Sequence, residues 1–154
     1  MEELEKLKAE EEDGIKNAEL ITQMYEEIDK QNFDFAIDLC TSNVSIYVAG
    51  GTEVMKKEGI KPMLTELFTA FPDYTHQIDA VIPKGHYVTV RCTYTGTHKA
   101  EFKGIPATGN TFTYAGIYLW HMHGGKIEEG WVLKDMLTLM TQLGMELKPK
   151  EAEI

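Results

Sequence analysis

The second half of this chain changes its hydrophobic periodicity from that of helices to that of strands, and this change constrains the fold most. Apolar and polar residues alternate with a period of two in four segments, which are residues 74–82, 86–103, 111–123 and 126–134. The breaks between these segments are short and rich in glycine, as at Pro83-Lys84-Gly85 and Gly124-Gly125. Breaks of this kind predict antiparallel hairpins.

Helical periodicity dominates the first half. The predicted order is a helix at 15–30, a helix at 33–40, a strand at 44–48, a helix at 60–71, the four strands, and a helix at 136–143. The last helix is predicted to bury Leu137, Met140 and Leu143. An antiparallel sheet with its helices on one face is an α+β fold. Because a curved sheet wrapped around N-terminal helices leaves a hollow, we expect a ligand site there.

Charge divides the chain into three parts. Residues 2–13 hold seven acids and two lysines, so residues 1–14 are predicted to form an acidic extension, either a frayed helix or disordered. Residues 15–145 are predicted to form a single domain, and residues 146–154 a loose tail. The net charge of −10 argues against nucleic acid as a partner. No apolar run is long enough to cross a membrane, and the charged start predicts a cytoplasmic protein.

An ordered set of short motifs resembles a known family. The motifs are Gly96-Thr97-His98, Phe102, Gly104-Ile105-Pro106-Ala107-Thr108-Gly109, Gly125-Lys126-Ile127, Glu129, Trp131, Asp135 and Gln142-Leu143-Gly144. In this order and at these spacings, they resemble SnoaL-like polyketide cyclases, which belong to the nuclear-transport-factor-2-like group. The resemblance covers residues 15–145 and implies a single cone-shaped α+β barrel.

The resemblance also implies two site residues. In such cyclases an Asp after the Trp of the last strand acts as acid and base, and a His fourteen residues earlier lines the same pocket. Asp135 and His121 fill these positions here. Burial in an apolar pocket would raise the pKa of Asp135. The residues alone leave another interpretation open, in which Asp135 is the N-cap of the helix that follows.

Strand parity extends this prediction. If Asp135 faces the hollow, then the alternate residues of the same strand, Leu133, Trp131 and Glu129, face it too. His121 would share its face of the preceding strand with Leu119. We therefore expect these side chains to bind the substrate.

The other histidines are predicted to contribute less. His98 either lines the pocket mouth or stands at a strand bend, and His76 and His86 are predicted to lie on the surface. His121 and His123 form an H-x-H pair on one strand, but no second motif supplies a third ligand, so we predict no metal site.

The leading hypothesis is an enzyme that performs aldol-type proton transfer on a small hydrophobic carbonyl compound. A methylene between two carbonyls is already acidic, so this reaction needs no cofactor. The alternatives are an isomerase, a dehydratase or an epoxide hydrolase, the last with Glu129 as second carboxylate, or else a non-catalytic binding module. We also expect a homodimer through the outer sheet face, with Tyr118 and Trp120 in the contact.

Overall fold

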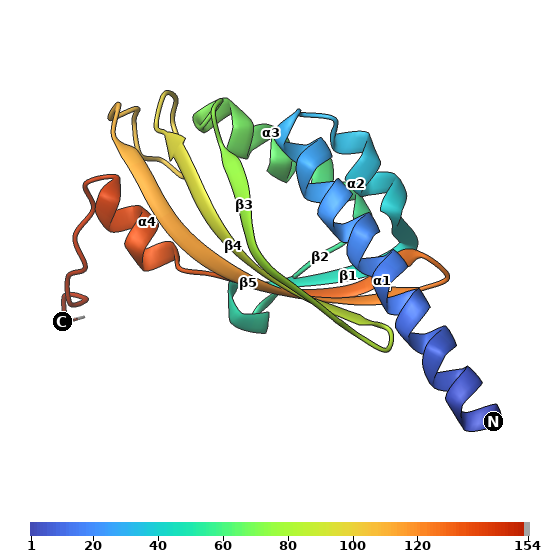
Figure 1. Cartoon of the computed structure of the whole chain (residues 1–154). Coiled ribbons are helices and arrows are strands. Elements are labelled where there is room, and N and C mark those ends of the chain that lie inside the picture. Colours follow the sequence, from blue (N-terminus) through green and yellow to red (C-terminus); the bar gives the residue numbers. More distant parts are fainter. Residues whose placement is uncertain (153–154) are drawn as a thin grey trace.

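The computed structural model describes residues 1–152, and Figure 1 shows a curved sheet with helices on its concave side. The helices are α1 (Glu2–Asp29), α2 (Phe33–Leu39), α3 (Ile60–Ala70) and α4 (Met136–Gln142), with short 3-10 turns at Ala49–Gly51 and Lys57–Gly59. The strands are β1 (Cys40–Val48), β2 (Glu53–Met55), β3 (Thr75–Lys84), β4 (Tyr87–Thr97), β5 (Thr111–His123) and β6 (Lys126–Lys134). Helices α1, α2 and α3 cover one face of the sheet, and α4 lies beside β5 on the other side.

The six strands run in the order β2-β1-β6-β5-β4-β3. Neighbouring strands are antiparallel except β1 and β6, which are parallel. The predicted α+β cone is therefore confirmed. Its sheet is mixed and open, however, whereas an antiparallel barrel was predicted. Short breaks predicted the hairpins correctly, but they carry no information on how β1 pairs with a strand some 80 residues later.

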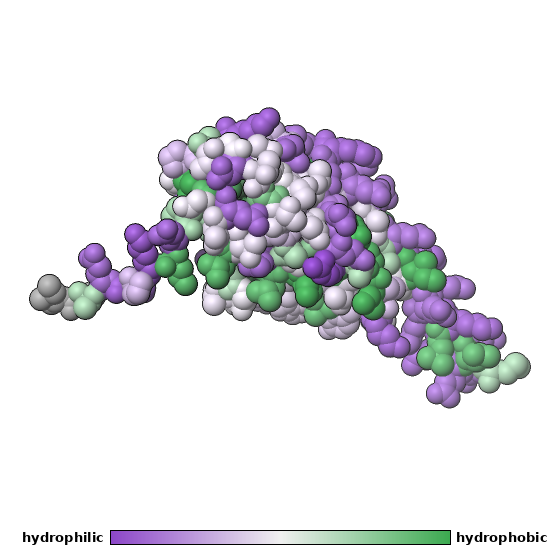
Figure 2. Space-filling model, turned by 60° about the vertical axis from the view of Figure 1, so that its left-hand side comes forward, coloured by the Kyte–Doolittle hydropathy of each residue, from purple (hydrophilic) through white to green (hydrophobic). Residues whose placement is uncertain are grey.

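Several element bounds differ from those predicted. The strand predicted to reach residue 103 ends at Thr97, because residues 98–110 fold back as a loop held by a bridge between Phe102 and Ile105. Strand β2 was not predicted. Helix α1 begins at Glu2, so the acidic segment is helical, and Figure 2 shows this end projecting from the body.

The two faces of the sheet are the reverse of those predicted. On β5 the aromatic residues Tyr114, Tyr118 and Trp120 are buried on the concave side, whereas Ile117 is 53% exposed on the convex side. Tyr118 and Trp120 therefore cannot form an outer-face contact. A homodimer stays a prediction, and it would have to use outward side chains such as Ile117 and Leu133. Alternation defines two faces, but it does not say which one the helices cover.

The final helix is also rotated relative to the prediction. Leu139 and Leu143 are buried, whereas Leu137 is 59% exposed. Gly144 follows in the left-handed region, with φ of 93°, which is typical of the residue after a helix end. The predicted end of this helix was thus correct, as was the burial of Leu143, whereas the predicted burial of Leu137 was wrong.

Gly130 on β6 allows the Trp120 ring to lie flat across the neighbouring strand. The two residues are cross-strand partners, and a Cβ added at Gly130 would overlap the Trp120 ring. We expect Gly130→Ala to lower the free energy of unfolding by about 1–3 kcal/mol, as overpacking does. Urea denaturation measures this change. The same substitution in a Trp120→Leu background should cost much less, and equal costs in both backgrounds would contradict the steric explanation.

Phe71, the residue that follows α3, is the centre of a buried aromatic cluster. Its ring is fully buried and lies 4.7 Å from the Phe102 ring and 4.8 Å from the Phe112 ring, centre to centre. The preceding carbonyl, of Ala70, accepts hydrogen bonds from the backbone N–H groups of Lys99 and Ala100. The end of α3 therefore holds the 98–110 loop in place.

Candidate functional site

A cavity of about 990 Å³ opens between the helices and the concave face of the sheet. Its walls come from α1, α2, α3, β1, β3, β5 and β6, and most of its side chains are apolar, for example Met24, Ile28, Leu64, Ile127 and Val132. This volume is at the upper end of the range for small-molecule sites. The cavity therefore has room for an apolar molecule of several rings or an extended chain.

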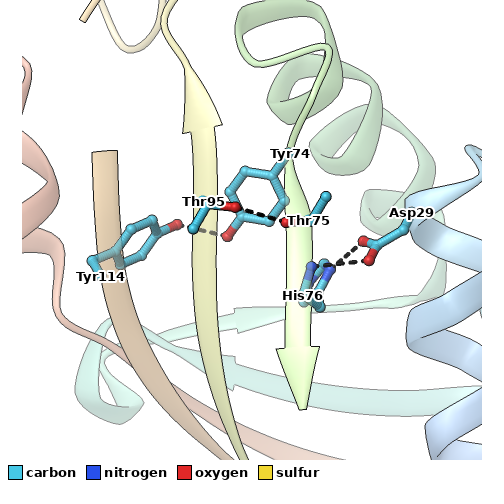
Figure 3. A network of polar contacts seen from close by, with 6 residues as sticks. All are labelled: Asp29, Tyr74, Thr75, His76, Thr95 and Tyr114. Atoms are coloured by element: carbon cyan, nitrogen blue, oxygen red, sulfur yellow. Dashed lines mark hydrogen bonds and ion pairs between the residues drawn. The ribbon is translucent and has the colours of Figure 1, made fainter. Parts of the chain in front are cut away.

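His76 lies at the wall of this cavity, and its buried side chain pairs with the partly exposed Asp29 (Figure 3). The His76 Nδ1 atom lies 2.6 Å from Asp29 Oδ1, and the backbone N–H of His76 donates to Asp29 Oδ2 at 2.9 Å. Only 4% of the His76 side chain is exposed. Asp29 is the last residue of α1, so the pair joins the helix to β3. The imidazole is held in a single orientation.

This pairing also determines the protonation of the His76 ring. A carboxylate can only accept, so Nδ1 carries the proton and the lone pair lies on Nε2. Burial lowers the pKa of His76 below its ordinary value of 6.5; the Asp29 carboxylate opposes this effect, and Lys134 adds to it. At neutral pH the ring is therefore neutral, and its Nε2 can take a proton.

Phenol groups supply hydrogen-bond donors around the same space. Tyr25, Tyr114 and Tyr118 line the cavity. The Tyr25 hydroxyl accepts from Trp120 Nε1 at 2.9 Å, and the Tyr114 hydroxyl lies 2.7 Å from that of Tyr74. Burial raises the pKa of each phenol, that of Tyr114 to about 12. These hydroxyls therefore keep their protons and suit a ligand that carries carbonyl oxygens.

Lys134 is a further cavity residue, at the end of β6. Its Nζ atom lies 5.2 Å from the centre of the Tyr94 ring and 6.0 Å from that of Tyr74. Burial lowers the pKa of Lys134 to about 8. The cavity thus combines an oriented imidazole, phenol donors and an amine within largely apolar walls.

Asp135, predicted to lie at the bottom of the pocket, is not among the residues that line it. Its Oδ1 accepts from the Thr138 backbone N–H at 3.1 Å, and its Oδ2 accepts from the Thr138 hydroxyl at 2.6 Å. These two hydrogen bonds lower its pKa, the opposite of the predicted rise. Asp135 is therefore the N-cap of α4, the alternative that its sequence context left open.

His121 also lies outside the cavity, on the convex face of β5. Its ring stacks on Tyr87 with centres 4.8 Å apart, and Nδ1 is 3.5 Å from Glu128 and 3.8 Å from Glu129. The register explains why His121 and Asp135 do not meet. His121 pairs with Glu129, whereas the Asp135 backbone N–H donates to Ala115, six residues away along β5.

Residues fourteen apart face each other elsewhere in this hairpin. The cross-strand pair with this separation is Tyr118 and Val132, and both line the cavity. The positions that are fourteen residues apart and face each other in the cavity are thus occupied by a phenol and an apolar side chain, not by a His and an Asp.

The remaining predicted site residues are dispersed. Trp131 stacks on Tyr47 on the convex face, where Leu119 and Glu129 also lie. Leu133 is 64% exposed and only borders the cavity. His98 is fully buried behind Phe71, with Nδ1 2.9 Å from the Thr108 hydroxyl. It therefore stands at the strand end and does not line the cavity mouth.

His76 is the candidate site residue that sequence reasoning missed. It was predicted to lie on the surface, although it alternates with Tyr74 and Ile78 along β3, and this parity was the available signal. Its partner Asp29 is 47 residues away, and no local pattern connects the two. Within residues 1–152, no cluster of three or more His, Cys, Asp or Glu side chains has the arrangement of a metal site. In the same part of the chain, none of the helices has the length and hydropathy of a membrane span.

Comparisons with known proteins bear on the family and the fold. The family model described as SnoaL-like polyketide cyclase matches residues 19–143. No curated protein sequence matches the chain significantly.

Solved structures share the fold. IdmH from Streptomyces antibioticus, provisionally assigned as a polyketide cyclase, is 26% identical with a TM-score of 0.75, over 84% of this chain and 99% of that one. A provisionally assigned polyketide cyclase from Acidithiobacillus ferrooxidans is 25% identical with a TM-score of 0.73, over 84% and 94% of the two chains. AclR from Streptomyces galilaeus, provisionally assigned as a hydroxylase, has a TM-score of 0.79 at 21% identity. The match covers 85% of this chain and 97% of that one.

Proposed function

This chain belongs to the SnoaL-like polyketide cyclase family, and we propose that it performs acid/base chemistry on a small hydrophobic carbonyl compound, with His76 as the proton acceptor. The observation that carries this proposal is the buried His76 imidazole, which lies at the wall of the 990 Å³ cavity and is paired with the Asp29 carboxylate. An imidazole whose Nδ1 is held by a carboxylate is the usual arrangement of a general base.

The proposed reaction is an intramolecular aldol closure. His76 Nε2 removes a proton from a methylene between two carbonyls, and Asp29 stabilises the imidazolium that forms. The resulting enolate carbon attacks a second carbonyl of the same molecule, so one C–C bond forms and the attacked oxygen becomes an alkoxide. His76 then returns its proton to that alkoxide. The hydroxyls of Tyr25, Tyr114 and Tyr118 can donate to the oxygens on which negative charge develops.

The apolar walls would contribute by holding the two reacting carbons together. A flexible chain that reacts with itself loses rate to its many unproductive conformations, and a shaped cavity removes most of them. Exclusion of water also strengthens the hydrogen bonds to the enolate. Glu129 on the convex face counts against epoxide hydrolysis as a variant of this chemistry, since that reaction relied on Glu129 as a second carboxylate near the base.

Deuterium exchange tests the proposal without the natural substrate. β-Keto esters and ketones are incubated in D₂O with wild-type protein, with His76→Gln and with Asp135→Asn, and loss of the acidic C–H signal is followed by NMR. We expect catalysed exchange in the wild type and in Asp135→Asn, and its loss in His76→Gln. The reverse pattern would assign the base to Asp135, as the family resemblance implied. A folded wild-type protein that exchanges none of these compounds would support a carrier instead.

A further inference from the structure

Nothing in the described part of the chain balances the positive charge of Lys134. Within residues 1–152 no carboxylate forms a salt bridge with its Nζ atom, and no side-chain hydrogen bond reaches that atom. The amine instead lies over the faces of Tyr74 and Tyr94. Aromatic faces attract a cation, but they do not neutralise it.

The groups that face Lys134 supply no countercharge, and Glu53 and Glu66, the carboxylates that line the same cavity, form no salt bridge with it. Tyr74, directly before β3, and His76 on β3 face it, as do Cys92 and Tyr94 from β4. Burial raises the pKa of the Cys92 thiol to about 12 and that of the Tyr94 phenol still further, so both groups stay neutral at physiological pH.

The charged groups nearby do not supply a partner either. Lys103, in the 98–110 loop, adds a second positive charge. The carboxylate of Asp29 lies behind His76 and is already bound to the imidazole ring and its backbone N–H.

Another lysine of the same cavity provides a contrast. Lys56 also lines the wall, but its Nζ atom donates to the Asn43 carbonyl at 3.0 Å, to Asn43 Oδ1 at 3.2 Å and to the Ser45 hydroxyl at 2.9 Å. Its hydrogen-bonding capacity is used within the protein. The amine of Lys134, in contrast, has no hydrogen-bond partner among the described residues, although burying an unpaired cation is costly.

We propose that the ligand of this cavity is an amphipathic anion, an apolar body with one carboxylate or enolate oxygen that pairs with Lys134. This inference rests on the proposed function, because it names the substrate class of the same cavity. It also fits the reaction, since removal of a proton by His76 creates an enolate whose charge an ammonium group would stabilise. The ligand would thus complete an ion pair of which the protein holds one half.

Binding of two matched probes tests this inference. Decanoate and decanamide have the same apolar chain, and only decanoate is charged at pH 7. We expect wild-type protein to bind decanoate about tenfold more tightly by isothermal titration calorimetry, the effect of one charge-assisted contact. Lys134→Met should remove this preference and leave the affinity for decanamide unchanged. Lys103→Met, which removes the other nearby amine, should retain most of the preference.

The pH dependence supplies a second readout. The preference for decanoate should disappear as the pH rises through about 8 in the wild type, because the Lys134 amine then loses its proton. Lys134→Met should show no such change. Equal affinity for the two probes in the wild type, a preference that survives in Lys134→Met, or binding of neither probe by the folded protein would each overturn the inference.

The outcome can be separated from that of the exchange experiment. His76→Gln should lose exchange and keep the preference for decanoate. If exchange depends on His76 while the wild type shows no preference for the anion, the base is in place and the ligand is neutral. If the preference is present and exchange is absent, the cavity binds anions without catalysing proton transfer.

Discussion

Replacing Asp29 with asparagine should lower the rate of deuterium exchange by about 10²–10⁴-fold, which is the usual contribution of a correctly held base. The substitution preserves the shape of the side chain at position 29 but changes which nitrogen of the His76 ring carries the proton. An asparagine amide that donates to Nδ1 selects the tautomer with its proton on Nε2, and that nitrogen can no longer accept a proton from the substrate. The loss should appear in kcat/KM, measured by NMR with the compound that the wild type exchanges fastest.

A pH profile distinguishes this role of Asp29 from a purely structural one. The rising limb of kcat/KM for the wild type should lie below pH 6.5, because burial lowers the pKa of His76. Asp29 opposes that effect, so in Asp29→Asn the residual activity should rise at still lower pH. Asp34→Asn is the matched control, since Asp34 is an exposed carboxylate whose partner is Lys61. An unchanged rate in Asp29→Asn would contradict the proposed base.

Phe71→Ala should lower the free energy of unfolding by about 3–5 kcal/mol, the range for deleting a buried aromatic ring. Phe71 is fully buried, and its ring meets those of Phe102 and Phe112 at less than 5 Å. Removal leaves a void that the rigid strand β5 cannot fill. Because Phe102 belongs to the 98–110 loop, that loop should also lose its anchor. Guanidinium denaturation followed by tryptophan fluorescence measures the change in stability.

Two further variants make the Phe71 prediction specific. Phe71→Leu keeps most of the volume and should cost clearly less than Phe71→Ala. Leu137→Ala removes a side chain of comparable size that is 59% exposed, and it should change stability by less than about 0.5 kcal/mol. If Phe71→Ala lowers the free energy of unfolding no more than Leu137→Ala does, the aromatic cluster around Phe71 does not stabilise the fold.

Much of the local structure could be predicted from the residues. The alternation in 111–123 and 126–134 predicted β5 and β6 with their observed bounds, because period-two patterns and Gly124-Gly125 are local signals. The helical stripe at Ile60, Leu64 and Leu67 predicted α3 for the same reason. The parallel pairing of β1 with β6 was not predictable in this way, since it depends on where the chain returns after α1 and α2 have packed.

The candidate site shows the same division between local and non-local information. The ordered motifs and the alternation of residues by themselves predicted the cone, its hollow and its strands other than β2. Only the tertiary structure decided which sheet face the helices cover, and with it that Tyr118 points inward and His121 outward. The reason is that alternation is symmetric between the two faces, whereas curvature and helix packing are not. The His76–Asp29 pair depends on the same packing, because only the docking of the end of α1 on β3 brings together two residues 47 positions apart.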